Sequence, residues 1–98
     1  MATYTASHAK SITTVAAQVD TLTLSGAGKT LRVVGRSGST YTYFTTAPLY
    51  QTPTTPTTEG DDCYVGGLIT VVDYPWNGSG AVIKLINSGI ATLTFMLI

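Results

Sequence analysis

The chain has 98 residues, with five basic and five acidic side chains that cancel, and one cysteine. This length fits a single domain, and zero net charge leaves no electrostatic footprint for nucleic acid or anionic lipid. The lone Cys63 excludes an internal disulfide or a Cys-rich zinc site, and no run reaches the roughly 18 apolar residues of a membrane helix. We also expect no signal peptide, because the first residues lack its charged and apolar regions.

Threonine dominates the polar composition. Nineteen Thr and seven Ser supply polarity to a chain in which 10% of residues are charged, against about 25% in a typical soluble domain. Threonine is β-branched and fits a pleated, half-exposed surface, so the composition predicts a nearly all-β chain. A surface with so few charges favours burial within a larger assembly.

The first ten residues show no clean period. We predict that Met1–Lys10 is an N-terminal arm, ordered only when something holds it, ahead of a domain over residues 11–98. Ser11–Val19 fits either a strand or a short helical turn. Thr21–Ser25 alternates with period two, which predicts a strand whose two leucines share one face.

The middle of the chain combines a predicted hairpin with a long loop. Thr30–Arg36 and Thr40–Thr46 are two apolar and β-branched segments joined by Ser37–Ser39, which predicts that they pair with each other. Ala47–Asp61 then contains three prolines and no core-forming pattern. Loops of this length inside a compact domain are usually functional or disordered.

The last third reads as further strands. Cys63–Val65 and Leu68–Asp73 are short apolar segments, and Tyr74–Gly80 is dense in turn-forming residues. Ala81–Asn87 is apolar on both faces except at Lys84, which predicts a buried central strand, and Ala91–Ile98 alternates and is predicted to pair. Together the segments predict an all-β fold, a small single-domain β-sandwich or jelly roll with one long Pro/Thr-rich loop.

Residues that could support catalysis do not converge. Ser25–Thr30 resembles the end of a phosphate-binding loop, but Thr23 stands where the motif needs Gly and a strand follows instead of a helix. His8 lies in the predicted arm, where nothing holds it beside a nucleophile. Cys63 fits the role of a small buried hydrophobe. We therefore predict no catalytic residue and no enzymatic activity.

An acidic cluster follows the proline-rich loop. Glu59, Asp61 and Asp62 supply carboxylates, but they lack the alternating pattern of a calcium loop. A solvated turn is the simpler interpretation. We predict no bound metal and no cofactor.

Two segments have the character of contact surfaces. Thr52–Thr58 favours extended polyproline conformations with a low ordering cost, which suits a strap laid on a partner, although an exposed loop explains the same composition. Tyr and Trp are typical interface anchors, but Trp76 also fits a role as a cap on the sandwich core. The candidate partner contacts are Tyr4, Tyr50, Pro53, Pro56, Tyr74 and Trp76.

Five stretches carry a family resemblance: Thr21–Gly26, Leu31–Gly38, Tyr41–Phe44, Pro56–Val65 and Val82–Gly89. Together they resemble the small β-rich virion proteins of tailed bacteriophages, a class that includes capsid decoration proteins and minor head or tail components. The resemblance implies a decoration protein, made in the host cytoplasm, that binds the outer surface of the capsid and stabilises the shell. Its expected partner is the major capsid protein, with self-association also possible, and neither nucleic acid nor membrane is expected.

The resemblance leaves a second role open. A minor tail or head-fibre protein would contact host surface glycans, with Tyr41, Tyr43 and Trp76 as stacking platforms. One domain without a fibrous repeat or coiled coil fits decoration better than a fibre. A small hydrolase or metal enzyme is a third and weaker alternative, because no acid–base constellation is present.

Overall fold

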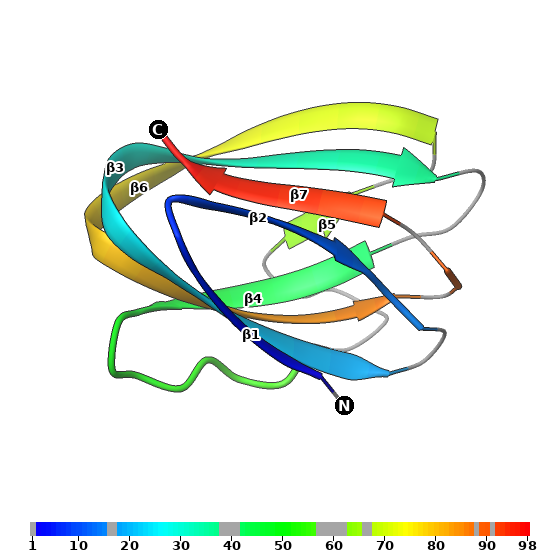
Figure 1. The fold of residues 1–98 in the computed structure, drawn as a ribbon, viewed down its shortest axis with the longest axis horizontal. Helices are drawn as coiled ribbons and strands as arrows, with labels where there is room; N and C mark the ends of the chain where they lie inside the picture. Colours follow the sequence, from blue (N-terminus) through cyan, green and yellow to red (C-terminus); the bar gives the residue numbers. More distant parts are fainter. Residues whose placement is uncertain are drawn as a thin grey trace.

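The computed structural model describes residues 2–15, 18–37, 42–56, 63–65, 68–87, 89–90 and 92–98. Their regular structure is entirely β, as the composition predicts. The strands are β1 (Thr3–Ser7), β2 (Ala9–Thr13), β3 (Val19–Ser37), β4 (Thr42–Pro48), β5 (Cys63–Val65), β6 (Leu68–Asn87) and β7 (Thr92–Leu97), shown in Figure 1. They form a sheet in the order β2-β7-β3-β6-β4-β5, with β1 beside β3.

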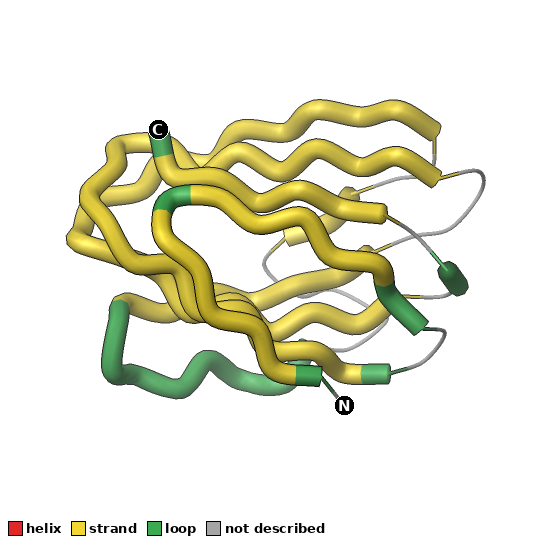
Figure 2. Tube along the Cα trace, in the orientation of Figure 1, coloured by secondary structure: helices red, strands yellow, loops and turns green. Residues whose placement is uncertain are grey.

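The sheet folds back on itself where β3 and β6 bend (Figure 2). Shifts in their antiparallel register fall between Ser25 and Gly28 and between Gly28 and Thr30. Glycines at such irregularities let the backbone turn a corner without a side-chain clash. The first layer therefore contains β1, the first half of β3, the second half of β6, β4 and β5. The second layer contains β2, β7 and the other halves of β3 and β6, which completes a β-sandwich.

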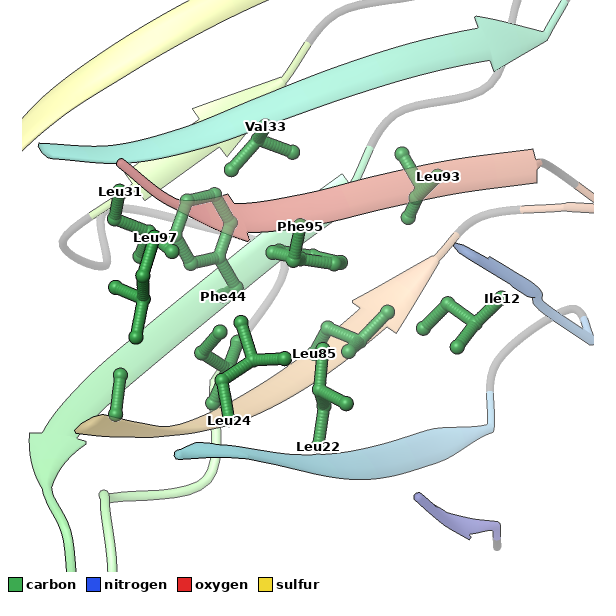
Figure 3. Packing of buried hydrophobic residues seen from close by; sticks show 12 residues of the cluster. Ile12, Leu22, Leu24, Leu31, Val33, Phe44, Leu85, Leu93, Phe95 and Leu97 are labelled. Atoms are coloured by element: carbon green, nitrogen blue, oxygen red, sulfur yellow. The ribbon is translucent and has the colours of Figure 1, made fainter. Parts of the chain in front are cut away.

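The core lies between the two layers (Figure 3). Phe44 of the first layer meets two rings of the second edge-on, Phe95 at 5.7 Å and Tyr74 at 5.4 Å between ring centroids. The alternating patterns predicted for the third and the last strand are confirmed, because their inward residues are buried. The buried apolar cluster comprises Ile12, Leu22, Leu24, Leu31, Val33, Phe44, Ala81, Ile83, Leu85, Leu93, Phe95 and Leu97.

The predicted N-terminal arm is instead part of the sheet. Thr3–Ser7 pairs parallel with β3, and Ala9–Thr13 pairs antiparallel with β7. The chain crosses between the layers at His8, whose N–H donates to the Ser25 carbonyl (2.9 Å) and whose carbonyl accepts from the N–H of Leu97 (2.7 Å). The backbone ladders of two sheet edges therefore order a segment whose side chains show no apolar pattern.

Two further predictions in the middle of the chain are corrected. The hairpin does not form: β3 pairs with β6 and β7, and β4 pairs with β6 and β5. The predicted turn over Tyr74–Gly80 lies within β6. Pro75 lies opposite Thr30 in the ladder, but the N–H and carbonyl of Thr30 both bond to Ile98 on the other side, so the missing N–H of Pro75 breaks no bond between these two residues. The segment 81–87 lies between β3 and β4, which confirms the predicted central strand.

Candidate functional site

The proline-rich segment covers the outer face of the first layer. Residues 49–56, which we call the strap, leave the end of β4 and run beneath it in Figure 2. The hydroxyl of Thr45 donates to the carbonyl oxygen of Thr54 in the strap. Thr45, Ala47 and Val82 are all buried, although they alternate with core residues and point away from the interior. Their burial therefore requires a cover, and the strap supplies it.

Two of the predicted partner contacts belong to this cover. Pro53 and Pro56 are buried, so neither side chain is available to a partner in this conformation. The sequence-based assignment of these two prolines is thereby corrected. Proline restricts the backbone and lowers the cost of ordering an extended segment, and here that property lets the strap lie on its own sheet. Residues 57–62, with the acidic cluster Glu59, Asp61 and Asp62, lie outside the described residues.

Tyr50, unlike the two buried prolines, is exposed to solvent. The N–H of Gln51 donates to the carbonyl oxygen of Pro48 (3.2 Å), which closes a four-residue turn with Tyr50 in its third position. Tyr50 has φ +67°, a left-handed conformation that such turns normally assign to Gly and that costs of order 1 kcal/mol or more for another residue. Its side chain is 99% exposed. The side chain of the neighbouring Leu49 packs directly against Gly80, so closely that a Cβ added to Gly80 would lie 2.5 Å from it. This contact fixes the turn.

The other aromatic candidates are tied to the core. Tyr4, Tyr74 and Trp76 are partly buried and pack against the core cluster. Trp76 Nε1 also donates to the carbonyl oxygen of Gly80 (3.1 Å), so the alternative role of Trp76 as a core cap is confirmed. Tyr41 lies outside the described residues and Tyr43 is half-buried. Trp76 packed on the core does not provide the open stacking platform expected of a glycan site.

The outer face of the second layer has no strap over it in the described part of the chain. We call it the open face. It carries a shallow depression of about 470 Å³ lined by Ser11, Val34, Thr92, Thr94 and Met96. The hydroxyls of Ser11 and Thr94 lie 2.7 Å apart. These side chains are exposed or half-buried, so the face is a mixture of hydroxyl and apolar groups.

A charged pair borders this depression and neutralises itself. Arg32 holds Asp73 through two contacts, Nε to Oδ1 at 2.8 Å and Nη2 to Oδ2 at 2.9 Å. The hydrogen bond from Arg32 lowers the pKa of Asp73; desolvation opposes this shift, and the charge of Arg32 adds to it. The hydrogen bond to Asp73 and the charge of Asp73 in turn raise the pKa of Arg32. Both side chains are roughly 40% exposed (39% and 44%), so the pair matters more for the charge of the face than for stability.

The remaining candidates for chemistry show no catalytic arrangement. Ser25–Thr30 spans the bend of β3 and runs on into strand, so it lacks the helix of a phosphate-binding loop. The ring of His8 is exposed, with Nδ1 3.0 Å from the hydroxyl of Ser7. Among the described residues, no three His, Cys, Asp or Glu side chains gather as a metal site requires. No helix in the same residues is long and apolar enough to span a bilayer.

Asp20 is a buried polar residue that the sequence reasoning missed. Only 1% of it is exposed, and its Oδ1 accepts from the N–H of Ala2 (3.0 Å) and from Nε2 of Gln18 (2.9 Å). Its Oδ2 is buried without a hydrogen-bond partner among the described atoms. Its burial could have been inferred from its position, because a residue two places before the inward-facing Leu22 lies on the same face of the strand. Asp20 fixes the start of β1 against β3.

Comparison with known proteins establishes the fold alone. No family model matches the chain, and no curated protein matches it. A solved structure, the pre-peptidase C-terminal domain of a collagenase from Bacillus anthracis, is similar to it with a TM-score of 0.50. The similarity covers 100% of this chain and 95% of that one, at 10% sequence identity. Two very different sequences therefore share this β arrangement.

Proposed function

We propose that the protein is a structural component of a tailed-phage virion that decorates the capsid and stabilises the shell without catalysing a reaction. The observation that supports this most is the contrast between the two outer faces of the sandwich. The strap covers the first, whereas the open face presents Ser11, Val34, Thr94 and Met96 beside a self-neutralised ion pair. A weakly charged face of hydroxyl and apolar groups suits a flat protein partner, and the major capsid protein is the partner that the sequence resemblance suggests.

The proposed mechanism is multivalent contact. A single small domain offers a contact area at the low end for stable complexes, so each contact is modest. A copy that touches neighbouring capsid subunits gains from effective concentration, because one contact holds the other close to its site. Binding to the assembled shell and not to free subunits then stabilises the shell by mass action.

The test uses particles that lack the protein and purified protein added back. We expect the wild type to bind at high copy number, counted by quantitative mass spectrometry, and to raise the temperature at which particles release their genome. Thr94→Arg places a long charged side chain in the depression of the open face and should abolish this rescue. Thr5→Arg is the matched control, because Thr5 is exposed on β1 of the first layer, and it should rescue like the wild type.

Three results would contradict the proposal. In the first, the wild type is found only at the tail. In the second, particles with and without the protein lose DNA at the same temperature. In the third, Thr94→Arg and Thr5→Arg rescue equally well, which would remove the open face as the contact surface.

A further inference from the structure

Tyr50 combines an unfavourable backbone conformation with a fully exposed aromatic ring. It has φ +67° in a turn position suited to Gly, and it exposes 99% of a large aromatic residue. Strained backbone persists where the surroundings enforce it, and it clusters at sites that bind or switch. An exposed tyrosine is a frequent interface anchor because it offers a large, rigid area with a polar tip.

Among the described residues, His8 is the other non-glycine residue with a left-handed backbone, and its contacts explain that conformation. His8 also has a positive φ, +65°. Its N–H and carbonyl bond to both layers of the sandwich, and its ring lies over Gly26, where a Cβ would come within 2.4 Å of it. Tyr50 has no comparable role in the described structure, since its ring extends into solvent.

The turn around Tyr50 is held firmly in place. Leu49 packs at Gly80, the Gln51 N–H closes the turn onto Pro48, and Thr45 holds the strap a few residues further on. The backbone is therefore fixed on both sides of an exposed ring. Such an arrangement presents a side chain at low entropic cost on binding.

We infer that Tyr50 is an anchor that inserts into a neutral hollow on the shell protein, at a contact separate from the open face. This inference rests on the proposed function. Tyr50 belongs to the strap on the first layer, whereas the open face belongs to the second, so one copy has contacts on two sides and can join two neighbouring subunits. No charged residue occurs between Thr42 and Thr58, which indicates a hollow that is apolar and uncharged.

The experiment compares three variants of Tyr50 in the isolated protein and on particles that lack it. Tyr50→Gly suits the left-handed turn, so its melting temperature should exceed that of Tyr50→Ala by roughly 4 °C or more. Despite this gain, its affinity for the particles should fall about tenfold or more. Tyr50→Phe keeps the ring and the strain, and it should bind within about threefold of the wild type.

The outcomes separate this inference from the proposed function. If the wild type does not bind the particles, the proposed function fails and the anchor fails with it. If the wild type binds and Tyr50→Gly binds equally well, the anchor alone is refuted. If Tyr50→Gly is no more stable than Tyr50→Ala, the strain on which the inference depends is absent, and the inference is overturned.

Discussion

Replacing Gly26 with alanine tests the crossover that joins the two layers. Gly26 has φ +105°, and a Cβ there would lie 2.4 Å from Nε2 of His8. The backbone of His8 is bonded to both Ser25 and Leu97, so its exposed ring has to turn aside and lose the contact between Nδ1 and the hydroxyl of Ser7. The substitution therefore forces either the ring or the crossover out of position.

The expected cost has two parts. A non-glycine residue at this φ costs about 1–2 kcal/mol, and turning the ring of His8 aside loses a hydrogen bond worth about 0.5–1.5 kcal/mol. Together they amount to roughly 1.5–3.5 kcal/mol. For a domain of this size, 1 kcal/mol corresponds to about 4–8 °C, so Gly26→Ala should lower the melting temperature by at least about 6 °C.

A double-mutant cycle separates the two parts. In a His8→Gly background the ring is gone, and Gly26→Ala should cost only the backbone part, about 1–2 kcal/mol. Urea unfolding of the wild type, both single variants and the double variant gives the coupling energy, expected at about 0.5–1.5 kcal/mol. An equal cost of Gly26→Ala in both backgrounds would show that the ring does not lie over Gly26. A neutral Gly26→Ala would refute the crossover geometry altogether.

Three further substitutions test the buried carboxylate, the surface ion pair and the strap. Asp20→Ala removes the acceptor of two hydrogen bonds and should lower the free energy of unfolding in urea by about 1–3 kcal/mol. Asp20→Asn keeps one oxygen and should lower it by less. Equal losses for the two variants would contradict the role of this acceptor. Because Arg32 lowers the pKa of Asp73, their pairing stabilises the fold above the unfolded-state pKa of about 4 and stops doing so as pH falls through the lower folded pKa. The difference in melting temperature between the wild type and Asp73→Asn should therefore shrink between pH 6 and pH 2, and a constant difference would argue against the pairing. Thr45→Val removes the bond to the strap and should cost about 1 kcal/mol while speeding cleavage of residues 49–56 by a non-specific protease; unchanged cleavage would mean that this bond does not hold the strap.

The parts of the fold that were predictable from sequence are those with a local period. Leu22 and Leu24, like Leu93 and Phe95, alternate with polar residues, and a period of two is enough to assign the buried face. The first two strands lack this pattern, because their inward positions include Ala6 and a partly buried Lys10. They are ordered by pairing with β3 and β7, which are distant in sequence, and no local rule reports such pairing.

Only some features of the candidate site were likewise predictable from the sequence. Exposure of Tyr50 was predictable from its place in a proline-rich loop, whereas its left-handed backbone was not. Pro53 and Pro56 were assigned to a partner because a stiff, uncharged segment suits binding, but the rule does not say whose surface it binds. Asp20 was missed because one inward polar residue at the start of an alternating strand resembles an ordinary strand boundary.

Both outer faces of the sandwich carry apolar residues, but within the described chain only those of the first layer are covered. Outward residues on the first layer include the apolar Ala47 and Val82, and the strap removes both from solvent. Outward positions on the second layer include Val34, Val71 and Met96, and Val71 remains 58% exposed. The described chain has no second strap to cover them, and with few charges its surface has little else to keep such a face soluble. A partner that covers the open face would play the part for the second layer that residues 49–56 play for the first, which is why the proposal places the shell there.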